Sequence, residues 1–267
     1  METVTSRDGT PIAYERTGEG PPLVMVHGMT STHRSWELLP KLREHFTVYA
    51  MERRGRGESG DAADYSLDRE VEDVVALVDS IGEGPVDLLG HSHGAILVLE
   101  AALRRAERVR RLVLYEGSLP FPEGTELYRS EALDAVRERL GAGDEEGALL
   151  TFYREIAMVS PEDIEMVRSL PQYPTLVAMA PTIPRELQAE EGYYAKFDPA
   201  RLGGFRVPTL ILVGGESPEF EKATAEALEA ALPDGRLVVL PGQGHIAQRT
   251  APELFEREVL RFLLEDG

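Results

Sequence analysis

The stretch Val86–Ala95, VDLLGHSHGA, decides which fold the chain can adopt. A short run with the character of a buried strand leads into a G-x-S-x-G pattern, and the mostly apolar run AILVLEAAL follows it. The two glycines permit a tight turn, because a Cβ at either position would collide with the neighbouring strand or helix. We therefore predict a strained strand-to-helix elbow that exposes the hydroxyl of Ser92 at the carboxyl edge of a sheet. The amide of His93 then points to the place where an oxyanion forms.

Strand and helix patterns alternate on both sides of this elbow. Short apolar or alternating runs predict strands at 3–6, 11–15, 22–26, 47–51, 111–115, 209–213 and 236–240. Helical periodicity predicts helices at 36–46, 66–81 and 220–232. A last helix is predicted to begin at Thr250, which forms a capping-box pattern with Glu253. Such alternation is typical of an α/β fold with a mostly parallel central sheet flanked by helices.

The alternation stops between Leu119 and about Val207, where helices and proline-rich loops replace strands. We predict that residues 119–206 form a helical cap, or lid, inserted into a core made of residues 1–118 and 207–267. Open α/β sheets place their binding sites at the carboxyl edge, so we expect the cap to lie over that edge. Most aromatic and methionine side chains of the cap would form its own core, and a few would line a substrate pocket.

The composition narrows the classes of partner. A chain of 267 residues, 42% of them hydrophobic, suits one large domain or one domain with an insertion. The formal net charge of -19 argues against nucleic acid and against an anionic membrane surface. The opening METVTSRDGT has no apolar core, and no apolar run reaches the length of a membrane span. We therefore expect a cytoplasmic protein without a signal peptide.

No cofactor and no metal ion are expected. The chain has no cysteine, so thiolate metal sites and disulfides are excluded. The glycine-rich loop Arg53–Gly60, RRGRGESG, lacks both the G-K-[ST] ending and the G-x-G-x-x-G spacing of a phosphate cradle. His91 and His93 flank Ser92, but no carboxylate or further histidine completes a metal-ligand spacing around them.

The base that activates Ser92 can be found by elimination among six histidines. His27 belongs to a loop after an early strand, and the elbow directs the histidines beside Ser92 away from its oxygen. His33 and His45 lie near the first predicted helix and are expected to face solvent. His245 remains, in the loop PGQGHIAQ, which can reach back over the sheet edge to Ser92.

A carboxylate must orient the imidazole of His245 and stabilise its charged form. Two glutamates fit this requirement. Glu116 closes the strand after the elbow helix, and Glu216 follows the next strand in GGESP. Both would lie at the carboxyl edge and both precede His245, so their positions alone leave the choice open.

Taken together, these motifs resemble a serine hydrolase of the α/β-hydrolase superfamily with a helical cap. The shared marks extend over essentially the whole chain and are HGMT at 27–30, RGRGES, GHSHG, LVLYEGS, PTLILVGGESP and PGQGH. The chain order serine, acid, histidine is the order of the family. The resemblance implies that Ser92 is the nucleophile and His245 the general base. It also implies that the amides of Met29 and His93 form an oxyanion hole.

The sequence departs from the family at the acid. Many members have an aspartate directly before a proline after the strand at 209–213, and here that position is Ser217. Glu216 is one position early, so its side chain need not point at the histidine. Some relatives take the acid from the end of the preceding strand, which corresponds to Glu116. We therefore favour Glu116 as the acid and keep Glu216 as the alternate.

The predicted function is that of a carboxylesterase, which hydrolyses an ester or related acyl compound through an acyl-enzyme. The aromatic and thioether side chains of the cap favour a small, neutral, moderately apolar acyl substrate, and the acidic charge disfavours a polyanion. The same triad could instead serve a lyase or a cofactor-free peroxidase, and the same frame could serve a ligand receptor. The sequence leaves a homodimer open.

Overall fold

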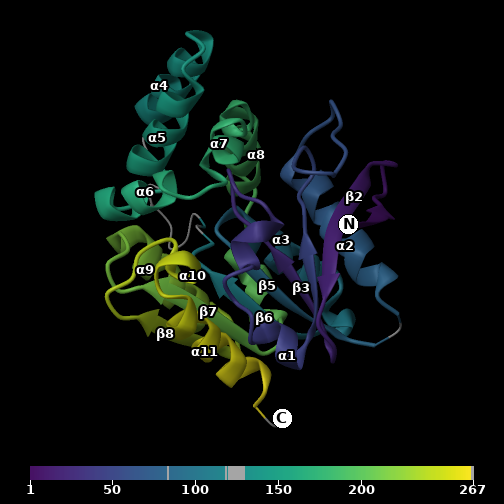
Figure 1. Cartoon of the computed structure of the whole chain (residues 1–267). Helices are drawn as coiled ribbons and strands as arrows, with labels where there is room; N and C mark the ends of the chain where they lie inside the picture. Colours follow the sequence, from purple (N-terminus) through teal and green to yellow (C-terminus); the bar gives the residue numbers. More distant parts are fainter. Residues whose placement is uncertain (83, 118, 120–129, 266–267) are drawn as a thin grey trace.

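A mixed sheet forms the centre of the molecule (Figure 1). The computed structural model describes residues 1–82, 84–117, 119 and 130–265, and within them eight strands pair in the order β1-β2-β4-β3-β5-β6-β7-β8. The strands are β1 (Glu2–Thr5), β2 (Pro11–Thr17), β3 (Pro22–Val26), β4 (Thr47–Met51), β5 (Val86–His91), β6 (Val109–Tyr115), β7 (Thr209–Gly214) and β8 (Gly235–Leu240). β2 runs antiparallel to both neighbours, whereas every pairing from β4 to β8 is parallel. The predicted α/β fold is confirmed.

Helices cover both faces of the sheet (Figure 1). Alternate residues of β3 belong to two different apolar clusters, one on each face. The first cluster includes side chains of α2 (Leu67–Ser80), α3 (His93–Arg104) and α9 (Glu219–Ala231), and the second includes side chains of α1 (Leu42–His45) and α11 (Pro252–Leu263). Burial on both faces explains why the central strands read as continuous apolar runs.

The predicted helix at 36–46 is wrong. The chain there forms a 3-10 turn, η1 (His33–Trp36), and then only the short α1, with Pro40 between them. A proline inside a helix removes a backbone hydrogen bond and clashes with the preceding turn, so the two pieces cannot join. The apolar pattern nevertheless marked buried side chains, which are Trp36, Leu39, Leu42 and Phe46.

The last helix begins later than the capping-box pattern predicted. α11 starts at Pro252 with Ala251 as its N-cap. Thr250 ends a separate short helix, α10 (Ala247–Thr250), and its hydroxyl donates to Oε1 of Gln243 over 2.8 Å. Proline at the first helical position supplies the start signal, because its missing N–H is not needed there.

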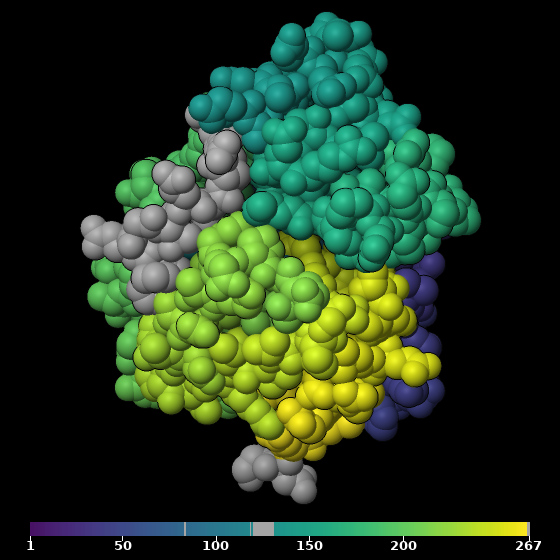
Figure 2. All heavy atoms as spheres, turned by 90° about the vertical axis from the view of Figure 1, so that its left-hand side faces the viewer, coloured from purple at the N-terminus to yellow at the C-terminus, as the bar shows by residue number. Residues whose placement is uncertain are grey.

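Helices replace strands between β6 and β7. Residues 130–206, all described, contain no strand and form α4 (Ser130–Gly141), α5 (Glu145–Glu155), α6 (Pro161–Arg168), α7 (Tyr173–Val177), α8 (Ile183–Tyr194) and the 3-10 turns η3 (Ala180–Thr182) and η4 (Pro199–Gly204). Figure 2 shows the teal helices of this insertion above the green and yellow end of the chain. Most of their buried apolar side chains form a separate cluster, which also takes in Met29 and Ile246 from outside the insertion, whereas Leu202 of η4 belongs to the first cluster of the sheet.

The limits of the insertion can be followed on one side only. The predicted start of the cap near residue 119 adjoins 118 and 120–129, which lie outside the described residues.

None of the described helices is long and apolar enough to cross a bilayer.

Candidate active site

Ser92 occupies an elbow between β5 and α3, as its motif predicts. Its backbone has φ 55° and ψ -126°, which is a strained conformation for a residue with a side chain. A Cβ added at Gly90 would strike the carbonyl of Gly94, and a Cβ added at Gly94 would strike the carbonyl of Val26. Both positions therefore require glycine. His93 is the first residue of α3, so its amide has no acceptor inside the helix.

His245, in the loop after β8, bonds the carboxylate of Glu116. The ring Nδ1 donates to Oε2 of Glu116 over 2.7 Å, which leaves Nε2 for a second partner. Both side chains are buried. Burial lowers the pKa of His245, but the hydrogen bond and the charge of Glu116 outweigh it, so the pKa lies above the usual value of 6.5. The resulting pair is a base whose charged form is stabilised.

Glu116 directly follows β6 and is held from the end of β7. Its Oε1 accepts a hydrogen bond from the amide of Gly214 over 2.7 Å and another from the hydroxyl of Ser217. Ser217 stands where the resemblance points to an aspartate, and here it holds the glutamate instead. Glu216 is exposed. The structure thus brings Glu116, rather than Glu216, to the histidine.

Ser92 and His245 line one cavity between the sheet edge and the insertion. The cavity has two lobes, and both are lined by Ser92 and His245, by Met29, and by Phe152 from α5. Among the hydrogen bonds between described residues, none uses the backbone amide of Met29. The residues that the sequence singled out therefore meet in one place, with apolar side chains of the insertion as a wall.

The two lobes differ in charge. The acidic lobe has about 450 Å³ of empty space, including its opening to solvent, and is lined by Glu190, Glu221 and His93 among others. The arginine lobe has about 520 Å³, likewise with its opening included, and is lined by Arg249 and Ser31 among others. A substrate that reaches Ser92 therefore meets carboxylates on one side and a guanidinium on the other.

His91 supports the loop that carries His245. Its Nε2 donates to the backbone carbonyl of His245 over 2.8 Å, and its Nδ1 accepts from Nε2 of Gln248 over 3.2 Å. Burial holds the pKa of His91 well below its usual value, so the ring stays neutral and can accept at Nδ1.

His27, His33 and His45 lie outside the cavity lining. His27 is buried and its Nδ1 donates to the carbonyl of Gly28 over 2.8 Å. His45 is exposed, as expected. The expectation that His33 faces solvent is wrong, because its ring is largely buried against the carboxylate of Glu52. Glu52 follows β4 and attracts the ring across the sheet edge, which the local sequence does not reveal.

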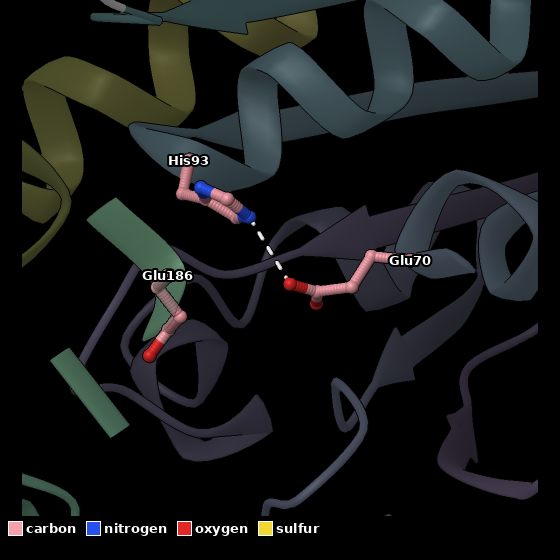
Figure 3. A group of neighbouring side chains, drawn as sticks. All are labelled: Glu70, His93 and Glu186. Carbon is pink, nitrogen blue, oxygen red and sulfur yellow. Dashed lines mark hydrogen bonds and ion pairs between the residues drawn. The ribbon is translucent and has the colours of Figure 1, made fainter. Parts of the chain in front are cut away.

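His93 extends its side chain into a buried cluster of charges. Figure 3 shows the ring directed at Glu70, with Glu186 beside the pair. Its Nε2 lies 3.1 Å from Glu70 and its Nδ1 lies 2.6 Å from Glu190. Burial and the charge of Arg53 lower the pKa of His93, but the two carboxylates outweigh them and raise it. The ring of His93 therefore places a positive charge beneath the elbow, while its backbone amide lies at the elbow itself.

Two arginines of the loop RRGRGESG complete this cluster. Arg53 lies 2.6 Å from Glu70 and 2.7 Å from Glu186, and Arg56 pairs with Glu186 as well. All four side chains are fully buried. Glu70 belongs to α2 and Glu186 to α8, so the cluster joins the insertion to the sheet. Sequence reasoning missed this role, since nothing in the loop shows which partners it meets.

Two sets of donor atoms lie close enough together to hold a metal ion. Within each set the atoms lie within 4.8 Å of one another, and the sets are Glu70, His93 and Glu186, and Glu116, Glu221 and His245. In the first set both carboxylates already bond the guanidinium of Arg53, a positive charge that competes with a cation. In the second, Glu116 already bonds the histidine. Each set is accounted for by hydrogen bonds and ion pairs among the side chains.

The chain is similar over nearly its whole length to known hydrolases. It is 28% identical over 258 residues to 2-(acetamidomethylene)succinate hydrolase of Mesorhizobium japonicum, which covers 92% of this chain and 89% of that protein. It is 26% identical over 238 residues to N-formylmaleamate deformylase of Pseudomonas putida, which covers 86% of this chain and 83% of that protein.

A solved structure and a family profile agree with these relatives. The crystal structure of an alpha/beta hydrolase from Sphaerobacter thermophilus superimposes with a TM-score of 0.84 at 34% identity, over 98% of this chain and 100% of that one. The sequence profile of the alpha/beta hydrolase family matches residues 23–258. The chain therefore belongs to the alpha/beta hydrolase family.

Proposed function

We propose that this hydrolase cleaves a carboxylic ester or related acyl compound with Ser92 as nucleophile, His245 as general base and Glu116 as the acid that orients it. The observation that carries the proposal is the 2.7 Å hydrogen bond from Nδ1 of His245 to Glu116, made by a histidine that lines the same cavity as Ser92. A buried histidine held in one tautomer by a carboxylate is the arrangement that activates a serine hydroxyl.

The proposed reaction begins when Nε2 of His245 takes the proton of Ser92 as Oγ attacks the substrate carbonyl. The oxyanion that forms accepts hydrogen bonds from the amides of Met29 and His93. The protonated ring then gives its proton to the leaving group, and the acyl-enzyme remains on Ser92. His245 next activates a water molecule, which releases the acid and restores the serine.

We further propose that residues 119–206 act as the cap of this site. Phe152, Ile156 and Leu187 of the insertion line the cavity beside Ser92. Such apolar side chains exclude water and strengthen the electrostatic interactions around a developing charge. The cap would therefore set which acyl groups reach the serine.

The first test is hydrolysis of a panel of p-nitrophenyl esters of increasing acyl length, together with a matching anilide. Ser92→Ala should lose turnover by on the order of 10³-fold or more, because no other group supplies the nucleophile. Ser80→Ala removes an exposed serine at the end of α2 and should leave turnover unchanged. Circular dichroism checks that both variants are folded.

The alternatives to hydrolysis give different results in the same assay. Turnover that survives in Ser92→Ala would refute the assigned nucleophile. A parent protein that binds the esters without releasing nitrophenol would favour the receptor, and products other than the acid and alcohol would favour a lyase or peroxidase.

A further inference from the structure

Arg249 lies in the arginine lobe, within reach of the proposed chemistry. It belongs to α10, which begins two residues after His245. The lobe that it lines is also lined by Ser92 and His245. Among the described residues that line the two lobes, Arg249 is the one arginine or lysine.

The guanidinium of Arg249 has no carboxylate partner among the described residues. Among the described residues, the guanidinium donates one long hydrogen bond of 3.5 Å to the hydroxyl of Ser31. Three arginines that are fully buried behave differently. Arg53 and Arg56 pair with Glu186, and Arg54 pairs with Asp73. The chain has 47 acidic residues, yet none of the described ones forms an ion pair with Arg249 beside the cavity.

Burying the guanidinium of Arg249 without a counter-ion costs free energy. Desolvation lowers the pKa of Arg249 from its usual value, although the group remains charged because guanidinium does not deprotonate in proteins. A partly desolvated charge gains far more from a partner than an exposed one does. The lobe is therefore prepared for an anion that arrives with the substrate.

The side-chain oxygen of Gln248, in the lining of the same lobe, has no hydrogen-bond partner among the described residues. Gln248 is buried, and its Oε1 accepts no hydrogen bond from any described residue. Its Nε2 must face His91, because Nε2 of that ring donates to the carbonyl of His245 and Nδ1 is left as the acceptor. Buried polar atoms are rarely left unpaired in a finished protein core. The lobe thus offers a charged donor on Arg249 and an unused acceptor on Gln248, and of these two a carboxylate can bind only the donor.

We infer that Arg249 binds a carboxylate of the substrate, so that the site takes a small acyl compound that carries a free carboxylate group. This inference rests on the proposed function, because it places the ester or amide bond at Ser92 and the carboxylate in the arginine lobe. The planar guanidinium fork matches a carboxylate in a bidentate geometry. Among its described lining residues the other lobe has Glu190 and Glu221 but no arginine or lysine, so the guanidinium that fits a carboxylate orients the substrate in one direction.

The rest of the lobe limits the substrate to a short apolar chain between its two polar ends. Apolar side chains of the insertion form its walls, and these are Phe152, Val159, Val167 and Leu176. A half-ester or half-amide of a short dicarboxylic acid has this shape. The aromatic and thioether side chains of the cap predict a neutral acyl group, and Arg249 replaces that prediction with an acyl group that carries a single negative charge.

The test compares monomethyl glutarate with dimethyl glutarate in a pH-stat assay. Both compounds present a methyl ester on the same carbon chain, and they differ in the free carboxylate. The parent should prefer the monoester. In Arg249→Met the ratio of kcat/KM for the monoester to that for the diester should fall about tenfold or more, which is the loss expected for a charge-assisted hydrogen-bonded pair.

Two further variants separate a binding role from a general loss of charge. Arg257→Met removes a guanidinium whose side chain is 67% exposed on α11, and it should leave the ratio unchanged. Arg249→Lys keeps the charge but loses the planar fork, so the ratio should lie between those of the parent and Arg249→Met.

Each outcome decides the question. A ratio that changes less than about twofold in Arg249→Met, or a parent that prefers the diester, overturns the inference. If the parent hydrolyses neither ester, the proposed function fails in this assay, and calorimetry decides on Arg249 alone. Glutarate that binds the parent but not Arg249→Met then supports the inference, whereas equal binding to both, or none to the parent, overturns it.

Discussion

Ser92 and Glu116 both have a positive φ, at 55° and 47°, although neither is glycine. They follow β5 and β6, which pair directly. Such strained residues persist only where their surroundings fix them, and they cluster at functional sites. Here the surroundings are hydrogen bonds: the amide of Ser92 donates to the carbonyl of Tyr115, and Glu116 is held by Gly214 and its neighbours. The strain therefore supports both proposed roles, and at Glu116 it does so without any motif.

Glu116→Gln should change the pH dependence of the reaction as well as its rate. The carboxylate raises the pKa of His245, and the base is active only when neutral, so kcat/KM rises with pH through that pKa. The amide cannot stabilise the charged ring, so this limb should move to lower pH, and kcat should fall by roughly 10³- to 10⁴-fold. The measurement is the pH profile for p-nitrophenyl butyrate.

Glu216→Gln is the matched control, because it makes the same change on an exposed neighbour of the site. It should leave both kcat and the rising limb of the pH profile of kcat/KM unchanged. If Glu216→Gln shifts the profile and Glu116→Gln does not, the assigned acid is wrong.

Some residues of the site could be predicted from sequence because their signals are local. Ser92 is marked by its own motif, and His245 by its glycine-rich loop between an apolar run and a helix. The choice of Glu116 needed knowledge of a family. Ser217 and Arg249 were not found, because their roles depend on partners that only the folded chain brings close.

At the scale of elements, a buried ionic cluster connects the insertion to the sheet. Arg53 follows β4, Glu70 lies on α2 and Glu186 lies on α8. Arg53 bonds both carboxylates, and its side chain is fully buried. Glu70 in turn bonds His93 at the start of α3. The position of α8 over the elbow is thus coupled to the helix that carries the proposed oxyanion amide.

Arg53→Met should destabilise the protein strongly, because two buried carboxylates lose a shared cation, which leaves, among the described cations, Arg56 alone for Glu186 and His93 alone for Glu70. Removing one partner of a buried ion pair typically costs about 3–5 kcal/mol. Urea unfolding should show this as a lower midpoint. Arg7→Met removes an arginine whose side chain is 80% exposed and should cost about 1 kcal/mol or less. Equal midpoints for the two variants would contradict the structural role of the cluster.

The elements themselves were predictable to different degrees. Strands such as β3 and β7 stand out because burial on both faces produces uninterrupted apolar runs. The first helix was overextended because the periodicity of buried side chains passes through Pro40, which stops the backbone. The sequence predicted that helices follow β6. Their arrangement over the cavity could not be predicted, because it depends on side-chain contacts such as those of Phe152 and Leu187.

At the scale of the whole molecule, charge is distributed unevenly between interior and surface. The chain has 47 acidic residues and 28 lysines and arginines. Several of the arginines are buried, and these include Arg53, Arg54 and Arg56. Each of these pairs with a buried carboxylate, and Arg54 pairs with the exposed Asp8 as well. The net charge of -19 must therefore be carried mostly by the surface, where like charges repel one another across water.

Salt should consequently stabilise this protein. Between 0.01 and 0.15 M NaCl the Debye length falls from about 30 Å to about 8 Å, which screens repulsion across the surface but barely affects the buried pairs. We expect Tm at pH 8, followed by circular dichroism, to rise by about 2 °C or more over this range. The rise should be smaller at pH 5.5, which lies nearer the pI of about 4.8 and where the net charge is lower. If Tm fell with added salt at pH 8, surface ion pairs would outweigh the net repulsion, and the distribution of charge described above would not govern stability.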